Sequence, residues 1–254
     1  MKKFMIVSAQ RSGSTWVADM LGSHPEVTMF SELFLRSGEG FPDWSPEGGV
    51  AYWNTYKKER KWAEGVFLRP RLVWVYLNSV FAPRSKKSAC GLKVMYDQFI
   101  RFPEILLYIL VKRVSVIHLV REDVVASYIS GRISHARKQP HARTDEAVKD
   151  VSVHIDVKRM KKKLARSEAM IKATRVLFKV LGIKYIEIGY EDLDHNRKNF
   201  DNLLLFVGVE IHDLKSSLRK LREAGYGKYI ENRKEILEAF SNTKWNQLAK
   251  EALS

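Results

Sequence analysis

Short apolar runs alternate along the chain with stretches in which apolar residues recur every three or four positions. The runs are rich in β-branched residues and predict buried strands, whereas the recurring stretches predict helices. We expect strands at residues 4–7, 27–30, 91–96, 114–120 and 183–188. Helices are expected after residue 15, from residue 124, and over 154–181 and 200–207. Because this alternation is typical of parallel strands joined by helices, an α/β fold is predicted.

A small polar loop separates the first predicted strand from the first helix and ends at Thr15. A strand–turn–helix of this kind directs backbone N–H groups at one point, at the positive end of a helix dipole. Gly13 would allow an anion to approach closely, and the polar side chains add donors. The loop lacks the second glycine and the following Lys of the triphosphatase loop. It therefore predicts a different cradle for phosphate or sulfate; the alternative is an ordinary turn in which Ser14 or Thr15 caps the helix.

Arg121 defines a second candidate site, at the carboxyl end of the strand predicted over 114–120. Open α/β sheets bind ligands at this end of their strands. Ser127 and Ser130 follow on one face of the next helix, within reach of the same point. The alternative is a surface Arg121 that pairs with Glu122 or Asp123.

Segments 11–16 and 121–130 both resemble parts of sulfotransferases that use 3′-phosphoadenosine 5′-phosphosulfate (PAPS). Arg-Ser-Gly-Ser-Thr-Trp is similar to the family's 5′-phosphosulfate loop, and Arg121 with Ser130 is similar to its 3′-phosphate site, which Ser127 fits less well. The resemblance implies a three-layer P-loop NTPase-like fold, PAPS as donor, 3′-phosphoadenosine 5′-phosphate (PAP) as product, and no metal. The residues implied to hold the donor are Arg11, Ser12, Gly13, Ser14, Thr15, Trp16, Arg121 and Ser130.

The resemblance extends over almost the whole chain and is weakest between about residues 36 and 88. We therefore expect a single domain, residues 1–254, with this divergent segment as a candidate acceptor-binding insertion. Its aromatic residues could line a sugar or lipid pocket or form the core of a helical cap. A later segment, Tyr190-Glu-Asp-Leu193, is similar to one that braces the fold in this family, so no chemistry is assigned to it.

Three side chains are candidates for catalysis: Glu32, Lys93 and Arg11. Glu32 lies in Ser-Glu-Leu-Phe, which resembles the segment of glycan sulfotransferases that holds a catalytic Glu, and it would accept the proton of the acceptor hydroxyl. Lys93 and Arg11 would balance charge on the leaving phosphate. The alternatives are a Glu32 paired with Arg36, a Lys93 exposed at a strand edge, and His24 as the base. His24 resembles part of a structural Ser-His-Pro turn, and His118 is expected to be a buried, hydrogen-bonded strand residue.

The chain carries a formal net charge of +15. Nucleic acid is an unlikely partner because neither zinc-finger spacing nor an RNA-binding aromatic motif occurs. The densest basic run, residues 158–166, is expected to be the solvated face of the helix over 154–181. The excess charge also suits acidic glycans, or peripheral contact with anionic lipid head groups. No histidine spacing indicates a metal site.

These observations together predict a sulfotransferase of class EC 2.8.2, which moves a sulfuryl group from PAPS to a hydroxyl of a glycan, glycolipid or related acceptor. The alternatives are a P-loop-type nucleotide kinase and a non-catalytic basic protein that binds nucleotide or nucleic acid. With no long apolar segment and one cysteine, Cys90, we expect a cytoplasmic, bacterial protein. The acceptor and the oligomeric state are left open.

Overall fold

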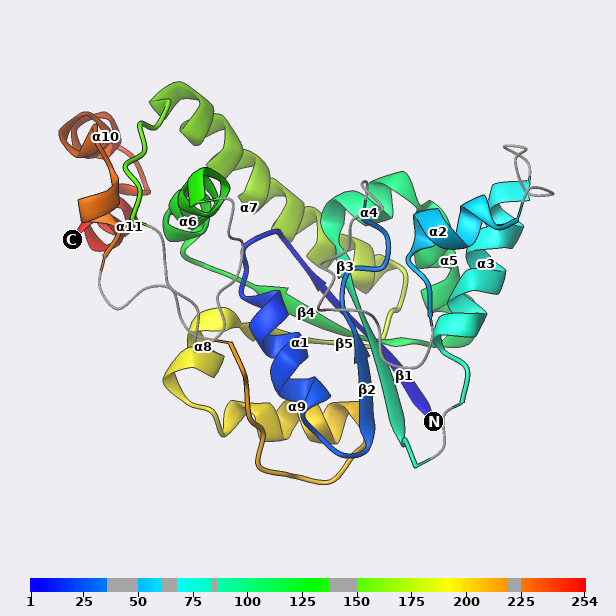
Figure 1. Ribbon diagram of the computed structural model, residues 1–254. Coiled ribbons are helices and arrows are strands. Elements are labelled where there is room, and N and C mark those ends of the chain that lie inside the picture. The colour runs from blue at the N-terminus through cyan, green and yellow to red at the C-terminus, as the bar shows by residue number, and fades with distance from the viewer. Residues whose placement is uncertain (36–49, 61–67, 84–85, 138–149, 219–224) are drawn as a thin grey trace.

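A five-stranded parallel sheet with the order β2-β3-β1-β4-β5 forms the centre of the protein (Figure 1). The computed structural model describes residues 1–35, 50–60, 68–83, 86–137, 150–218 and 225–254. The strands are β1 (Lys2–Ser8), β2 (Val27–Phe30), β3 (Ala89–Met95), β4 (Ser115–Val120) and β5 (Tyr185–Gly189). Each strand lies where an apolar run predicts it, so the α/β class with a parallel sheet is confirmed.

Helices connect the strands and cover both faces of the sheet. The first half of the chain contains α1 (Ser14–Gly22), α2 (Trp53–Lys58), α3 (Arg69–Val80), α4 (Tyr96–Arg101), α5 (Pro103–Lys112) and α6 (Val124–Arg137). The second half contains α7 (Val157–Val180), α8 (Tyr190–His195), α9 (Asn199–Val207), the 3-10 turn η4 (Gly227–Tyr229), α10 (Arg233–Phe240) and α11 (Asn246–Leu253).

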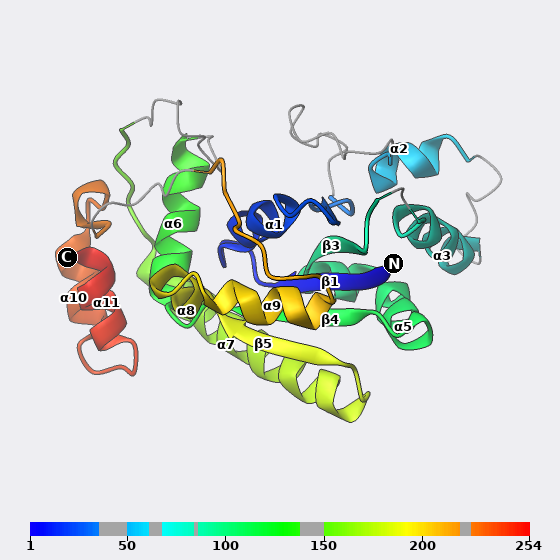
Figure 2. The ribbon, with the colours of Figure 1, turned by 90° about the horizontal axis from the view of Figure 1, so that it is seen from below.

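Two hydrophobic cores sandwich the sheet, because successive side chains of a strand point to opposite faces. In β1, Phe4 and Ile6 pack toward α1 and α9, whereas Met5 and Val7 pack toward α3, α5 and α7. Figures 1 and 2 show α1 and α9 on one side of the sheet and α5 and α7 on the other. The arrangement is the predicted three-layer one.

A third core lies beside the sheet, between α6 and α7 and the C-terminal helices α10 and α11 (Figure 1). Glu168 of α7 ties this unit down by accepting the indole N–H of Trp245 at 2.8 Å and by pairing with Lys244. The C-terminal helices therefore brace α6, the helix that carries Ser127 and Ser130.

The aromatic residues that the structure describes in the divergent segment form a core. Trp53 of α2 is 4% exposed and packs edge-on against Tyr76 of α3, with ring centroids 5.4 Å apart. It also contacts Phe34, whose tilted ring has its centroid 5.6 Å away. For these residues the helical-cap interpretation is correct. Trp44 and Trp62 lie outside the described residues.

Candidate functional site

The loop between β1 and α1 is shaped by a glycine that no other residue could replace without strain. Gly13 has a φ of 80°, in the left-handed region, and a Cβ atom placed there would lie 2.2 Å from Cδ2 of Tyr190. It precedes Ser14, the first residue of α1, and the helix has no side-chain cap. The alternative of Ser14 or Thr15 as N-cap is thus wrong: the N-cap is Gly13, which has no side chain to accept from the first N–H groups of the helix.

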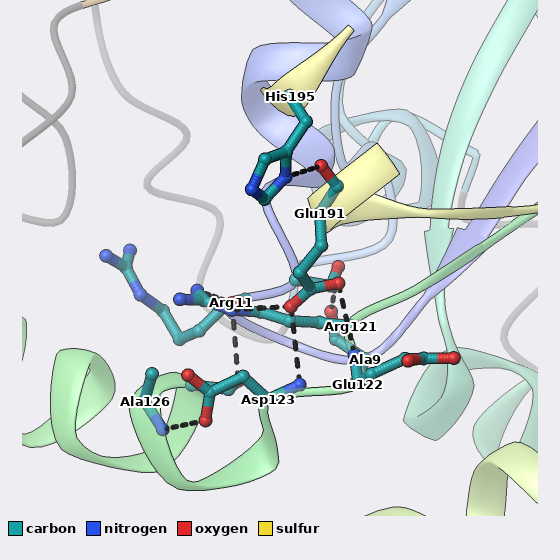
Figure 3. Close-up of polar contacts among 10 residues, drawn as sticks. Ala9, Arg11, Arg121, Glu122, Asp123, Ala126, Glu191 and His195 are labelled. Atoms are coloured by element: carbon teal, nitrogen blue, oxygen red, sulfur yellow. Dashed lines mark hydrogen bonds and ion pairs between the residues drawn. The ribbon is translucent and has the colours of Figure 1, made fainter. Parts of the chain in front are cut away.

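Arg11 lies at the centre of the polar contacts in this loop (Figure 3). Its Nη2 donates to Ser130 Oγ at 3.3 Å, while its carbonyl oxygen accepts from Arg121 Nη1 at 3.0 Å and from Ser127 Oγ at 3.3 Å. Burial lowers the pKa of Arg11; Tyr226 opposes this change and Arg121 adds to it. The two segments predicted to bind anions therefore meet, and both candidate serines belong to the same site.

The other loop residues support this geometry in different ways. Ser12 is 1% exposed and donates its hydroxyl proton to the carbonyl of Ala9 at 2.8 Å, which closes the turn. Trp16 packs edge-on against Tyr190 and Phe200, with centroids 5.8 and 5.4 Å away, and so belongs to the core that supports the loop.

Glu191, to which the sequence assigned no chemistry, connects the residues of the second candidate site (Figure 3). Its carboxylate accepts the backbone N–H groups of Glu122 and Asp123, each at 3.3 Å, and lies 3.9 Å from Nε of Arg121. The expected alternative for Arg121, a pair with Glu122 or Asp123, is therefore wrong. The only sequence signal for Glu191 was its place in Tyr190-Glu-Asp-Leu193, directly after a strand.

The start of α6 is fixed by Asp123, whose Oδ1 accepts the backbone N–H of Ala126 at 2.8 Å, as an N-cap residue does. On the other side of Arg121, the Tyr190 ring centroid lies 5.0 Å from the guanidinium carbon. The guanidinium is thus held by an aromatic ring, a carboxylate and a backbone carbonyl, all from other parts of the chain.

Lys93 and Glu32 form an ion pair of 3.1 Å at the carboxyl ends of β3 and β2. Lys93 is 2% exposed and also donates to Thr15 Oγ1 at 2.8 Å, which connects the pair to the first turn of α1. The alternative of a lysine in water at a strand edge is wrong. Glu32 pairs with Lys93; its other expected partner, Arg36, lies outside the described residues.

Burial lowers the pKa of Lys93, and this effect exceeds the opposing effect of Glu32; Arg11 lowers the pKa further. The contact of Lys93 with Thr15 places the ion pair beside the loop at residues 8–15. A buried lysine with a lowered pKa loses its proton at a lower pH than an exposed one.

The two candidate histidines are structural. His24 is 3% exposed, accepts the backbone N–H of Glu26 at 3.0 Å and lies 3.1 Å from the carbonyl of Glu210. His118, fully buried in β4, lies between Tyr96 Oη at 2.7 Å and Glu187 at 2.9 Å. Both rings are thus occupied by contacts of the fold.

Within the described ranges, no group of three His, Cys, Asp or Glu side chains is placed to hold a metal ion. The same part of the chain has no helix long and apolar enough to cross a membrane.

The arrangement provides two chemical functions side by side. Positive charge and donors for anionic groups come from Arg11, Arg121 and the start of α1, which has no side-chain cap. Glu32 adds a carboxylate, a group that can accept the proton of a hydroxyl.

Several solved structures are similar to the chain, and two of them are described here. One, described as "Sulfotransferase Domain from the Curacin Biosynthetic Pathway", has 17% identity over 84% of this chain and 76% of its own, with a TM-score of 0.47. A sulfotransferase from Alicyclobacillus acidocaldarius has 12% identity over 95% of this chain and 92% of its own, with a TM-score of 0.45. No curated protein sequence matches.

The model of the sulfotransferase family matches residues 3–213. This range includes both loops predicted to bind anions, the Glu32–Lys93 pair and Glu191. The match covers most of the chain, and the chain belongs to the sulfotransferase family.

Proposed function

We propose that this sulfotransferase uses PAPS as donor and a hydroxyl of a glycan, glycolipid or related molecule as acceptor. The observation that carries the proposal is the meeting of Arg11 and Arg121, 110 residues apart in the chain, beside the Glu32–Lys93 pair. PAPS carries anionic groups at both its 3′ and 5′ positions, so it needs two cationic sites on one surface.

The residues present fit this donor. Gly13 gives the turn before α1 its left-handed conformation, and Arg11 and Ser12 to Thr15 would hold the 5′ group at this turn. Arg121 and Ser130 would hold the 3′-phosphate beside the start of α6, through a guanidinium and a hydroxyl. Arg121 has Nη1 on the Arg11 carbonyl and Nε toward Glu191, while its Nη2 has no hydrogen-bond partner among the described residues. This edge of the guanidinium would be available to an anion.

The bound donor supplies the sulfuryl group, and the chain's own residues account for the rest of the chemistry. Oε1 of Glu32 is paired with Lys93, whereas its Oε2 makes no hydrogen bond or ion pair with a described residue and would take the proton of the acceptor hydroxyl. Lys93, held by Thr15, would provide positive charge where the leaving phosphate becomes more negative. Positioning by both loops would contribute much of the rate.

The choice of acceptor rests on resemblance. Glu32 occupies the position expected for glycan sulfotransferases, and residues 230–236 and 243–245 are similar to the tail of bacterial members. Localisation in a bacterial cytoplasm stays an expectation of the sequence.

Calorimetric titration with PAP, ADP and ATP, with and without Mg²⁺, tests the donor. We expect PAP to bind most tightly and independently of Mg²⁺, and Arg121→Ala to weaken it at least about tenfold, since a charge-assisted bond to phosphate contributes about 1.5–3 kcal/mol. Arg197→Ala, an exposed arginine of the α8–α9 connection, is the control and should bind normally. Preference for ATP with Mg²⁺ would instead indicate a kinase, and the absence of nucleotide binding would contradict the proposal.

A second experiment tests the acceptor. A panel of glycans and glycolipids is incubated with PAPS and the protein, and the formation of PAP is measured.

A further inference from the structure

Helix α7 concentrates the positive charge of the protein. Its 24 residues include nine Lys or Arg and a single acid, Glu168, which is already paired with Lys244. This one helix thus has a net charge of +8, against +15 for the whole chain. Neither anion site described above uses a residue of α7, so the charge is not explained by donor binding.

The exposed side of α7 changes character along its length. One side of the helix is buried through Met160, Leu164, Ile171 and Phe178. On the opposite side the N-terminal half exposes cations and the C-terminal half exposes apolar side chains. We refer to this surface as the α7 face; it comprises Lys158, Arg159, Lys162, Lys163, Arg166, Val176, Leu177 and Val180.

The aliphatic side chains in the apolar half of the α7 face are unusually exposed to solvent. Val176 is 60% exposed and Val180 is 77% exposed. Further exposed apolar side chains occur in the same layer of the protein, at Ile100 of α4 and at Leu107 and Val111 of α5. The α4 and α7 helices touch through Phe99 and Phe178, whose centroids are 6.5 Å apart, and Figure 2 shows α7 and α5 away from α1.

Lysines lie among these apolar residues. Lys172 and Lys179 are exposed on α7, and Lys112 directly follows Val111 at the end of α5. A surface that combines aliphatic side chains with lysine and lacks exposed acid on α7 differs from a surface made for a polyanion. Nucleic acids and acidic polysaccharides would be bound by the cations but would leave the valines in water. An anionic bilayer satisfies both halves, since phosphate head groups pair with Lys and Arg while aliphatic groups enter the interface.

We propose that the α7 face docks the protein on an anionic lipid surface. The basic half provides electrostatic attraction, and Val176, Leu177 and Val180 provide apolar contact with the interface. Docking of this kind requires no membrane-spanning segment and no particular donor. It would bring a lipid-linked acceptor near the enzyme, but it stands apart from the proposed reaction.

Co-sedimentation of the full chain with vesicles tests the proposal. One set of vesicles contains phosphatidylcholine alone and the other contains phosphatidylcholine mixed with phosphatidylglycerol. We expect at least about tenfold stronger binding to the anionic vesicles, because each Lys or Arg near such a surface contributes about 1 kcal/mol. Raising the ionic strength should weaken the binding.

Two double variants separate the halves of the face. Lys162→Gln with Arg166→Gln, and independently Val176→Ser with Val180→Ser, should each weaken binding to anionic vesicles about tenfold. Leu205→Ser with Ile211→Ser is the matched control, since these residues are 59% and 57% exposed outside the α7 layer. The control should bind as the parent protein does, and thermal melting would show that all variants fold.

Three results would overturn the proposal. The first is equal binding to both kinds of vesicle or to neither. The second is normal vesicle binding by the valine variant, which would mean that the apolar half takes no part. Tight binding of the parent protein to heparin or DNA would then identify the face as a polyanion site. The third is a concentration-dependent dimer that the valine variant abolishes, with no vesicle binding, which would make the face a contact between two copies. PAP titration of the same variants should be unchanged, so failure of docking is distinguishable from failure of the proposed reaction.

Discussion

Lys93 is the residue in which burial and charge oppose each other most directly. An ammonium group that is 2% exposed is unfavourable unless it is paired, and here it has both Glu32 and Thr15. A hydrophobic residue would fill the same position in β3 without this penalty. A chemical role therefore explains the Lys93–Glu32 pair better than a contribution to the stability of the fold does.

Replacing Glu32 by Gln tests the proposed base. Gln keeps the size of the side chain but does not accept the hydroxyl proton, so kcat should fall by about 10²–10⁴. Stopped assays of PAP formation would measure the loss, while calorimetry should give PAP affinity within about twofold of the parent. Glu26→Gln, at the opposite end of β2 and with no side-chain partner among the described residues, should leave kcat unchanged. Normal turnover by Glu32→Gln would show that the base is another group.

The lowered pKa of Lys93 predicts the alkaline limb of the pH–rate profile. Lys93 supports the leaving group only while protonated, so kcat should fall as the pH rises through its pKa, below the ordinary value of 10.5. In Lys93→Arg the guanidinium keeps its proton, and the alkaline limb should move to higher pH. A limb at the same pH in both proteins would show that Lys93 is not the group that titrates.

At the scale of elements, the proposed donor site depends on contacts at helix starts. The N-terminus of α6 is closed by Asp123 from within and by Glu191 from α8, while the start of α1 beside Arg11 has no side-chain cap. The register between β4 and β5 determines another contact, because it places His118 of β4 directly opposite Glu187 of β5. Burial lowers the pKa of His118 and Glu187 opposes this, so near neutral pH the contact is a hydrogen bond of a neutral imidazole rather than an ion pair.

Substitution of Glu191 by Gln tests whether the carboxylate positions Arg121. Gln offers one acceptor oxygen instead of two and removes the charge near Nε, so Arg121 and the α6 N-terminus should be held less firmly. We expect PAP affinity to fall about three- to tenfold, in line with about 1 kcal/mol for a lost charge-assisted contact. Asp192→Asn, in the same helix, is the control. An increase in affinity would mean that Glu191 competes with the 3′-phosphate, which would contradict the positioning role.

At the scale of the whole molecule, three hydrophobic cores hold the sheet and the helices together. Two of them sandwich the sheet, and the third joins α10 and α11 to α6 and α7. Because α6 carries Ser127 and Ser130, the C-terminal helices pack against one wall of the proposed donor site. A single domain over residues 1–254 stays a prediction.

Phe240→Ala tests that expectation. Phe240 is fully buried in the third core, so the cavity should lower the free energy of unfolding by about 3–5 kcal/mol. In one cooperative domain, differential scanning calorimetry should show a single transition at a lower temperature. A separate, earlier transition with the main one unchanged would show that the C-terminal helices form their own unit.

Much of this protein was determined by sequence alone, because the relevant signals are local. Apolar runs placed all five strands, since a buried parallel strand needs side chains that are apolar on both faces. The loop at residues 8–15 and Arg121 were identifiable because strand ends and helix starts lie next to each other along the chain. Residues 158–166 were correctly assigned to a solvated helix face from periodicity.

Tertiary structure decided the partners, because a partner is set by which distant segments the sheet order brings together. Lys93 could be an exposed strand residue or a buried catalytic one, and only the β2-β3-β1 order placed it between Glu32 and Thr15. Glu191 had no signal of its own, since its contacts with Arg121, Glu122 and Asp123 exist only where α8 follows β5 beside β4. The exposed valines of α7 likewise became visible only once the sheet had buried the opposite side of that helix.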